Sequence, residues 1–194
     1  MTRTIADFVV AAGFAIGALV TPMFNDAYAD PAIEDAESAM TGDFDFLVGK
    51  WIIQHHRLKE SMANSDEWTT FETRYEGWRH LDGAASIDVL SGTIDGKDFE
   101  GVSVRSYDDE SDEWVIYWMD NWNTRLREQV RGRFEDGVGT FYGRETYRGT
   151  TYRMRFLWKD ITDRSARWEQ AYQDPQSGDW ETNWVMEFSR IADK

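Results

Sequence analysis

The residues best suited to chemistry lie together at His55-His56-Arg57. Histidine moves protons near neutral pH, and the planar guanidinium of arginine can hold a carboxylate. Neighbouring residues of a β-strand point to opposite faces, so the two histidines do not bind one metal ion together. If Trp51 points into the domain, His55 and Arg57 follow it inward. We therefore predict that His55 faces a cavity, where it could act as a proton shuttle.

Other interpretations of this segment stay open. His55 could be a hydrogen-bonded interior residue without a chemical role, or a bulge could turn His56 inward in its place. In the catalytic interpretation, a carboxylate such as Glu72 pairs with His55. The predicted catalytic residues are His55, Arg57, Glu72, Tyr75 and Tyr117. They would support an isomerisation, cyclisation or hydration that needs no cofactor, with the arginine or a tyrosine orienting the substrate.

A second group of residues could line a binding cavity. Aromatic and amide side chains recur on the late segments of the chain, although packing alone explains tryptophans equally well. Most of the arginines and glutamates there should lie on a solvated outer face, with an inward Arg–carboxylate set as the alternative. The predicted ligand-binding residues are Trp51, Trp118, Arg155, Trp168, Gln170, Tyr172, Asn183 and Trp184.

Composition removes several classes of function. The chain has no cysteine, which excludes disulfides, thiolate-bound metals and a cysteine nucleophile. It also lacks a His/Asp/Glu cluster at ligand spacing, a Gly-x-Ser-x-Gly elbow, a phosphate loop and a dinucleotide fingerprint, so we expect no metal and no cofactor. The chain has 36 acidic and 21 basic residues, so its net charge is −15, and we expect no nucleic-acid partner.

The elements that must position these residues are predicted to be β-strands. Turn dipeptides such as Asp95-Gly96, Asp136-Gly137 and Arg148-Gly149 separate segments rich in aromatic and β-branched residues. Ten short antiparallel strands joined by tight turns close most economically as an up-and-down barrel, which leaves no exposed edge. The predicted strands are 46–57, 68–79, 84–91, 98–107, 113–121, 125–134, 138–147, 150–159, 165–173 and 180–190.

The N-terminal region reads as an export signal. Residues 1–29 combine Arg3, an apolar run and the small-x-small pattern Ala27-Tyr28-Ala29, which predicts a signal helix cleaved before Asp30. The run is shorter than the roughly 20 residues that span a bilayer, so we expect no stable membrane anchor. Residues 30–43 then form a leader segment and 44–190 the barrel domain. The protein is predicted to be periplasmic or secreted.

Several segments resemble a known group of barrels. Phe44-Asp45-Phe46-Leu47-Val48-Gly49-Lys50-Trp51 contains the Gly-x-Trp that opens the first strand of lipocalins and fatty-acid-binding proteins. Together with Glu135 to Gly143, Ser165 to Ala171 and Trp180 to Phe188, it is similar to an uncharacterised bacterial calycin-like family of unknown function. The resemblance covers about residues 44–190 and implies that Trp51 plugs the closed end. It implies a lipocalin-like cavity for a small molecule, but no particular activity.

Three hypotheses about function follow. The first is an exported barrel that binds a small apolar or amphipathic ligand in an aromatic-lined cavity. The second is a cofactor-independent enzyme that uses the same cavity with His55 as acid and base. The third is a protein-interaction module that uses exposed aromatic side chains, and self-association to a homo-oligomer stays open.

Overall fold

The computed structural model describes residues 42–192, so the predicted signal helix and most of the leader segment lie outside the described residues. Two short 3-10 turns, η1 (Asp45–Leu47) and η2 (Leu81–Gly83), accompany the strands. The strands are β1 (Gly49–Leu58), β2 (Trp68–His80), β3 (Ala85–Ile94), β4 (Lys97–Asp108), β5 (Glu113–Asp120), β6 (Val130–Glu135), β7 (Val138–Tyr147), β8 (Thr150–Lys159), β9 (Ser165–Gln173) and β10 (Trp180–Arg190). Between residues 42 and 192, no helix is long and apolar enough to cross a membrane.

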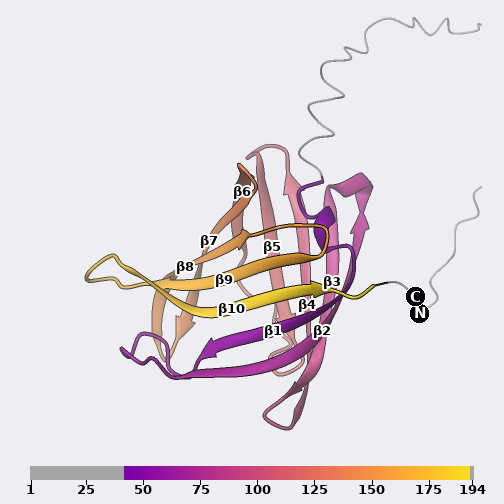
Figure 1. Cartoon of the computed structure of the whole chain (residues 1–194). Coiled ribbons are helices and arrows are strands. Elements are labelled where there is room, and N and C mark those ends of the chain that lie inside the picture. The colour runs from indigo at the N-terminus through magenta and orange to yellow at the C-terminus, as the bar shows by residue number, and fades with distance from the viewer. Residues whose placement is uncertain (1–41, 193–194) are drawn as a thin grey trace, which may run out of the picture.

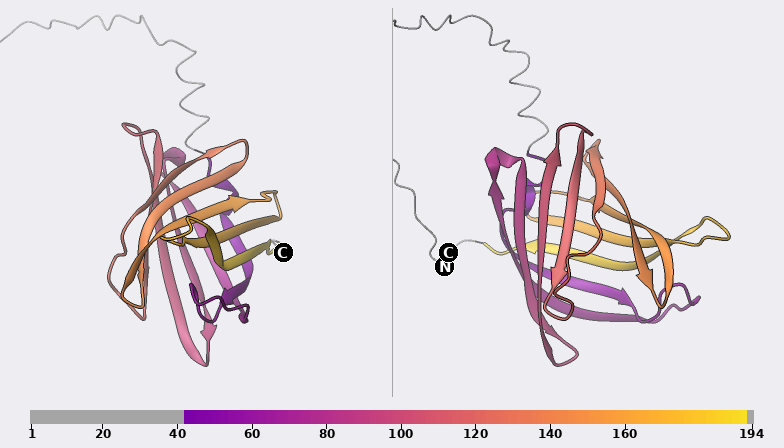
Figure 2. Two further views of the ribbon diagram at one scale, coloured as in Figure 1. Left: turned by 90° about the vertical axis from the view of Figure 1, so that its left-hand side faces the viewer. Right: turned by 180° about the vertical axis from the view of Figure 1, so that it is seen from behind.

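The strands form one closed antiparallel barrel. Each strand pairs with the next along the chain, and β1 closes the ring by pairing with β10 (Figures 1 and 2). In the Asp95-Gly96, Asp136-Gly137 and Arg148-Gly149 turns, both residues adopt positive φ angles, the conformation that two-residue hairpins require. The predicted all-β barrel of ten strands is therefore confirmed in the described part of the chain.

Three predicted strand boundaries differ by three residues or more, and one of them is the end of the third strand, which lies at Ile94 rather than at residue 91. The first strand begins at Gly49 rather than at residue 46, because residues 45–47 wind into η1 and bury Leu47. The sixth strand begins at Val130 rather than at residue 125. Only three residue pairs join β5 to β6, and the segment before Val130 leaves the sheet so that Arg127 can reach carboxylates on the two neighbouring strands.

One end of the barrel is closed by packed aromatic side chains. Trp51 is fully buried, and Phe44, which precedes η1, meets Trp114 edge to face at 5.0 Å between ring centroids. Arg190 lies 4.1 Å over the Trp51 ring and donates hydrogen bonds to the carbonyl oxygens of Phe46 and Asp163. Burial thus places Trp51 where the resemblance implied, and Arg190 ties the last strand to the segment that covers this end.

Arg190→Ala should destabilise the barrel from this closed end. The substitution removes charged hydrogen bonds to backbone carbonyls and the cation–π contact with Trp51, so we expect a loss of about 2–3 kcal/mol in the free energy of unfolding. Urea denaturation measures it. Arg164→Ala, which changes an exposed arginine on the neighbouring loop, is the control. Equal losses in both variants would contradict this role for Arg190.

Candidate functional site

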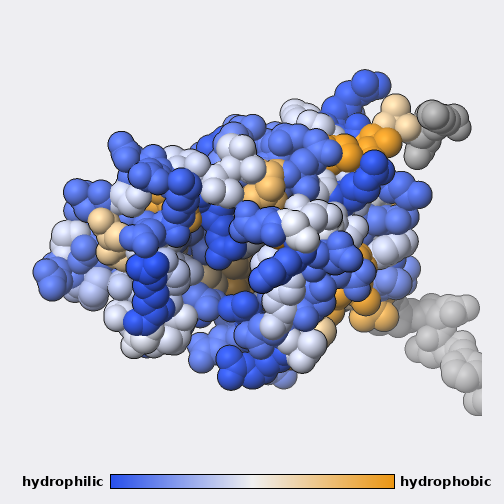
Figure 3. Space-filling view, turned by 90° about the horizontal axis from the view of Figure 1, so that it is seen from below, coloured by the Kyte–Doolittle hydropathy of each residue, from blue (hydrophilic) through white to orange (hydrophobic). Residues whose placement is uncertain are grey.

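The opposite end of the barrel is its mouth. The segments 59–67, 95–96, 121–129, 148–149 and 174–179, which connect the strands there, surround it. Figure 3 views the molecule from this side and shows a hollow with apolar residues at its floor. The mouth is where a ligand could enter the barrel, because the other end is covered by η1 and the aromatic plug.

Aromatic side chains line the inner wall behind the mouth. They pack against the buried core but keep part of their surface exposed, unlike Trp51, Trp114 and Phe141 of the closed end, which are fully buried. We call this region the mouth basin and define it by Phe71, Trp118, Tyr147, Tyr152, Phe156 and Trp184. Solvent therefore reaches part of each of these rings.

His55 lies in the wall of the mouth basin with its side chain fully buried. The indole N–H of Trp184 donates to His55 Nδ1 at 3.1 Å, so Nδ1 carries no proton. The proton is then on Nε2, which donates to the hydroxyl of Thr73 at 2.7 Å. The imidazole also stacks on Phe71, with 4.3 Å between ring centroids. Because Trp184 and Phe71 both line the basin, His55 holds two of its rings in place.

This environment keeps His55 neutral. Burial, followed by the nearby charges of Arg57 and His56, lowers the pKa of His55 to about 3. Both ring nitrogens are occupied by uncharged partners, and no carboxylate bonds to the ring among residues 42–192. The geometry of His55 therefore matches the alternative interpretation, in which it is a hydrogen-bonded interior residue. His56 points to the outer face, 3.7 Å from Glu187.

The structure separates the other predicted catalytic residues. Glu72 accepts a hydrogen bond from Gln54 on the outer face of the wall, because its neighbour Thr73 takes the inward position. Tyr117 also faces outward and donates to Gln129. The predicted pairing of His55 with Glu72 was therefore wrong, and Tyr117 does not reach the barrel interior. Alternation along the strand excludes both residues from the site.

Tyr75 and Arg57 both point inward, but they lie at opposite ends of the barrel. Tyr75 is buried in the closed half beside Asp88 and Arg105, and burial followed by the charge of Asp88 raises its pKa well above the usual value. Arg57 is exposed at the mouth, with its guanidinium 4.6 Å over the ring of Trp184. Of these two predicted substrate-orienting residues, only Arg57 borders the mouth basin.

Five of the predicted ligand-binding residues gather on the inner face of β9 and β10. On β9 the side chains of Trp168, Gln170 and Tyr172 alternate inward. On β10 the pairing register shifts between Thr182 and Trp184, which marks a bulge. A bulge re-aims side chains, and here consecutive residues turn inward: Asn183 bonds to Gln170, and Trp184 bonds to His55.

The remaining three predicted ligand-binding residues lie in different places. Trp118 lines the mouth basin, whereas Trp51 belongs to the closed end. Arg155 lies on the outer wall, 4.7 Å over the Trp180 ring, because its neighbours Met154 and Phe156 take the inward side. The prediction that Arg155 binds a ligand inside the barrel was therefore wrong.

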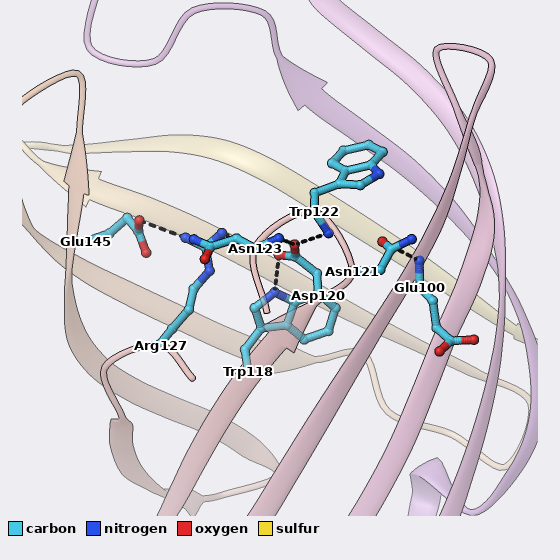
Figure 4. Close-up of polar contacts among 8 residues, drawn as sticks. All are labelled: Glu100, Trp118, Asp120, Asn121, Trp122, Asn123, Arg127 and Glu145. Atoms are coloured by element: carbon cyan, nitrogen blue, oxygen red, sulfur yellow. Dashed lines mark hydrogen bonds and ion pairs between the residues drawn. The ribbon is translucent and has the colours of Figure 1, made fainter. Parts of the chain in front are cut away.

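Sequence reasoning missed a charged group at the mouth (Figure 4). Arg127 bonds to Glu145 at 3.1 Å and to Asp120 at 3.4 Å. Asp120 also accepts the indole N–H of Trp118 at 3.2 Å and the backbone N–H of Asn123 at 2.7 Å. This group fixes one ring of the mouth basin and the segment that follows β5.

One signal for this group was present in the sequence. Glu145 shares its strand face with Phe141, so alternation places its carboxylate on the inner side. Arg127 gave no such signal, because it lies in an irregular segment whose path depends on its own ion pairs. In the described residues, no group of three or more histidine, aspartate or glutamate side chains could hold a metal ion.

Comparisons with known proteins bear on the fold. No protein-family model matches the chain, and no curated protein sequence matches it. One similar solved structure is the S-type phycobiliprotein lyase CPES from Guillardia theta, with a TM-score of 0.55 and 12% sequence identity over 84% of this chain and 100% of that one. Another is EF1p2_mFAP2b bound to DFHBI, with a TM-score of 0.43 and 12% identity over 78% of this chain and 99% of that one. At this identity the likeness concerns the fold alone, which is a closed antiparallel barrel of ten strands.

Proposed function

We propose that the protein binds a small apolar or amphipathic molecule in the mouth basin. One observation carries this proposal: the six aromatic side chains of the mouth basin keep exposed surface, whereas Trp51, Trp114 and Phe141 at the closed end are fully buried. Exposed ring faces inside a concave wall are what an apolar ligand covers on binding.

The polar residues around the basin hold its rings rigidly. His55 fixes Trp184 and Phe71 from within the wall, and Asp120 fixes Trp118. A preorganised pocket loses less conformational entropy when a ligand binds. In this proposal His55 is a positioning residue rather than a proton shuttle, and the protein acts after export, in the periplasm or outside the cell.

Titration with a neutral fluorescent dye such as Nile red tests the proposal. We expect saturable binding by the wild-type protein and about tenfold weaker binding by Trp184→Ala, because the variant loses a large apolar contact surface. Trp78→Ala is the matched control, since Trp78 is 42% exposed on β2, away from the basin. An equal effect of both substitutions, or no saturable binding, would refute a ligand site in the mouth basin.

A further inference from the structure

Arg57 is a cation at the mouth that has no counter-charge among the described residues. No carboxylate between residues 42 and 192 lies within ion-pairing distance of it. Two other arginines at the mouth are paired: Arg127 with Asp120 and Glu145, and Arg148 with Glu60. Because the Arg57 guanidinium stacks face-on against Trp184, the N–H groups along its edge stay available to a ligand.

Asn183 offers a second unused donor. Its side chain is 2% exposed, and its oxygen accepts a hydrogen bond from Gln170 at 3.0 Å. Its amide nitrogen is buried but has no partner among the described residues. An unsatisfied buried donor costs stability, so such groups are rare unless something else fills them. The bulge in β10 places the side chain of Asn183 on the inner side of the wall, beside Gln170.

The two unused donors flank the same ring. Arg57 lies directly opposite Trp184 in the pairing of β1 with β10, and Asn183 precedes Trp184 in the chain. Tyr172 lies nearby: burial, followed by the charge of Glu145, raises its pKa to about 12, so its hydroxyl keeps its proton. This side of the mouth basin therefore presents donors to a ligand.

Three carboxylates on the strands that form the mouth already have partners. Asp120 and Glu145 bond to Arg127, and Glu181 accepts the backbone N–H of Met62. The walls of the basin offer flat surfaces, as in the stacked pair of Tyr152 and Tyr172, whose ring planes differ by 9°.

We propose that the ligand is a flat apolar molecule with one carboxylate, which binds Arg57 and the amide nitrogen of Asn183 while its apolar body lies against Trp184. This inference rests on the proposed function and adds the chemical class of the ligand. The fork of donors on arginine matches the two oxygens of a carboxylate, and a buried amide adds a hydrogen bond without adding charge.

Three probes with one ring system test this class. 9-Anthracenecarboxylic acid, 9-anthracenemethanol and 9-anthracenemethylamine share a flat body and are negative, neutral and positive at neutral pH. The protein carries a net charge of −15, so its overall field attracts the amine and repels the acid. We expect the acid nevertheless to bind at least tenfold more tightly than either of the others, as measured by fluorescence titration or calorimetry.

Two variants test which residues cause the tighter binding of the acid. Arg57→Gln and Asn183→Leu should each weaken binding of the acid about tenfold and leave binding of the alcohol unchanged. Arg148→Gln, which alters a mouth arginine already paired with Glu60, is the control and should change neither. If all three probes bind equally well and the variants have no effect, the proposal of a carboxylate ligand is wrong, but the proposal of a ligand site in the mouth basin is retained. If none of the probes binds, the proposed function fails as well.

Discussion

Asp88→Asn is expected to lower the free energy of unfolding by about 3–5 kcal/mol, because it leaves a buried arginine without its counter-charge. Asp88 and Arg105 form an ion pair inside the barrel, with side chains only 2% and 5% exposed. Burial is the largest influence and by itself would lower the pKa of Arg105, but the charge and hydrogen bond of Asp88, together with Tyr75, outweigh it and raise that pKa above its usual value. Arg105 therefore stays charged in the folded protein and needs this partner.

Urea denaturation of a small set of variants checks this expectation. Glu76→Gln is the control, because it breaks an exposed pair with Lys50, and we expect it to cost less than about 1 kcal/mol. The double variant Asp88→Leu/Arg105→Met, which removes both charges, should be more stable than Asp88→Asn. Equal small losses for Asp88→Asn and Glu76→Gln would show that Arg105 does not depend on Asp88.

Acidification should weaken the fold through His55. Its pKa is about 3 in the folded protein, against an ordinary value of 6.5. The unfolded chain therefore binds a proton that the folded protein excludes. The contribution is fully present above pH 6.5 and is lost as the pH falls toward about 3, at up to about 1.4 kcal/mol for each pH unit.

His55→Gln isolates this effect from the other titrating groups. The variant keeps a hydrogen-bonding side chain but cannot take up the proton, so its stability should depend less steeply on pH. Between about pH 6.5 and 4.5, we expect wild type to lose roughly 2–3 kcal/mol more than the variant. Denaturation curves at several pH values measure the difference. Parallel losses in both proteins would mean that His55 is not held neutral by the fold.

The ring of strands could be predicted because its signals are local. Turn dipeptides such as Asp136-Gly137 and the alternation between them set β7 to β10 at their observed bounds. Where structure depends on distant contacts, the prediction failed. Residues 45–47 leave the strand to cover the closed end, and the segment around Arg127 follows its carboxylate partners instead of the sheet.

The site was predictable to the extent that alternation decides it. Alternation placed His55 on the inner side and should also have placed Thr73 there in preference to Glu72. It could not predict the bulge that turns both Asn183 and Trp184 inward, because a bulge interrupts the two-residue alternation of side chains on which the inference rests. Nor could sequence reveal that both nitrogens of His55 are occupied, since one partner comes from the far end of the chain.

Native mass spectrometry of the protein, purified without denaturation from the cells that make it, tests a ligand site in the mouth basin most directly. We expect a reproducible small-molecule adduct in a one-to-one ratio, released on denaturation and acidic in character. Recovery of the bare polypeptide alone, under conditions that keep the barrel folded, would contradict it.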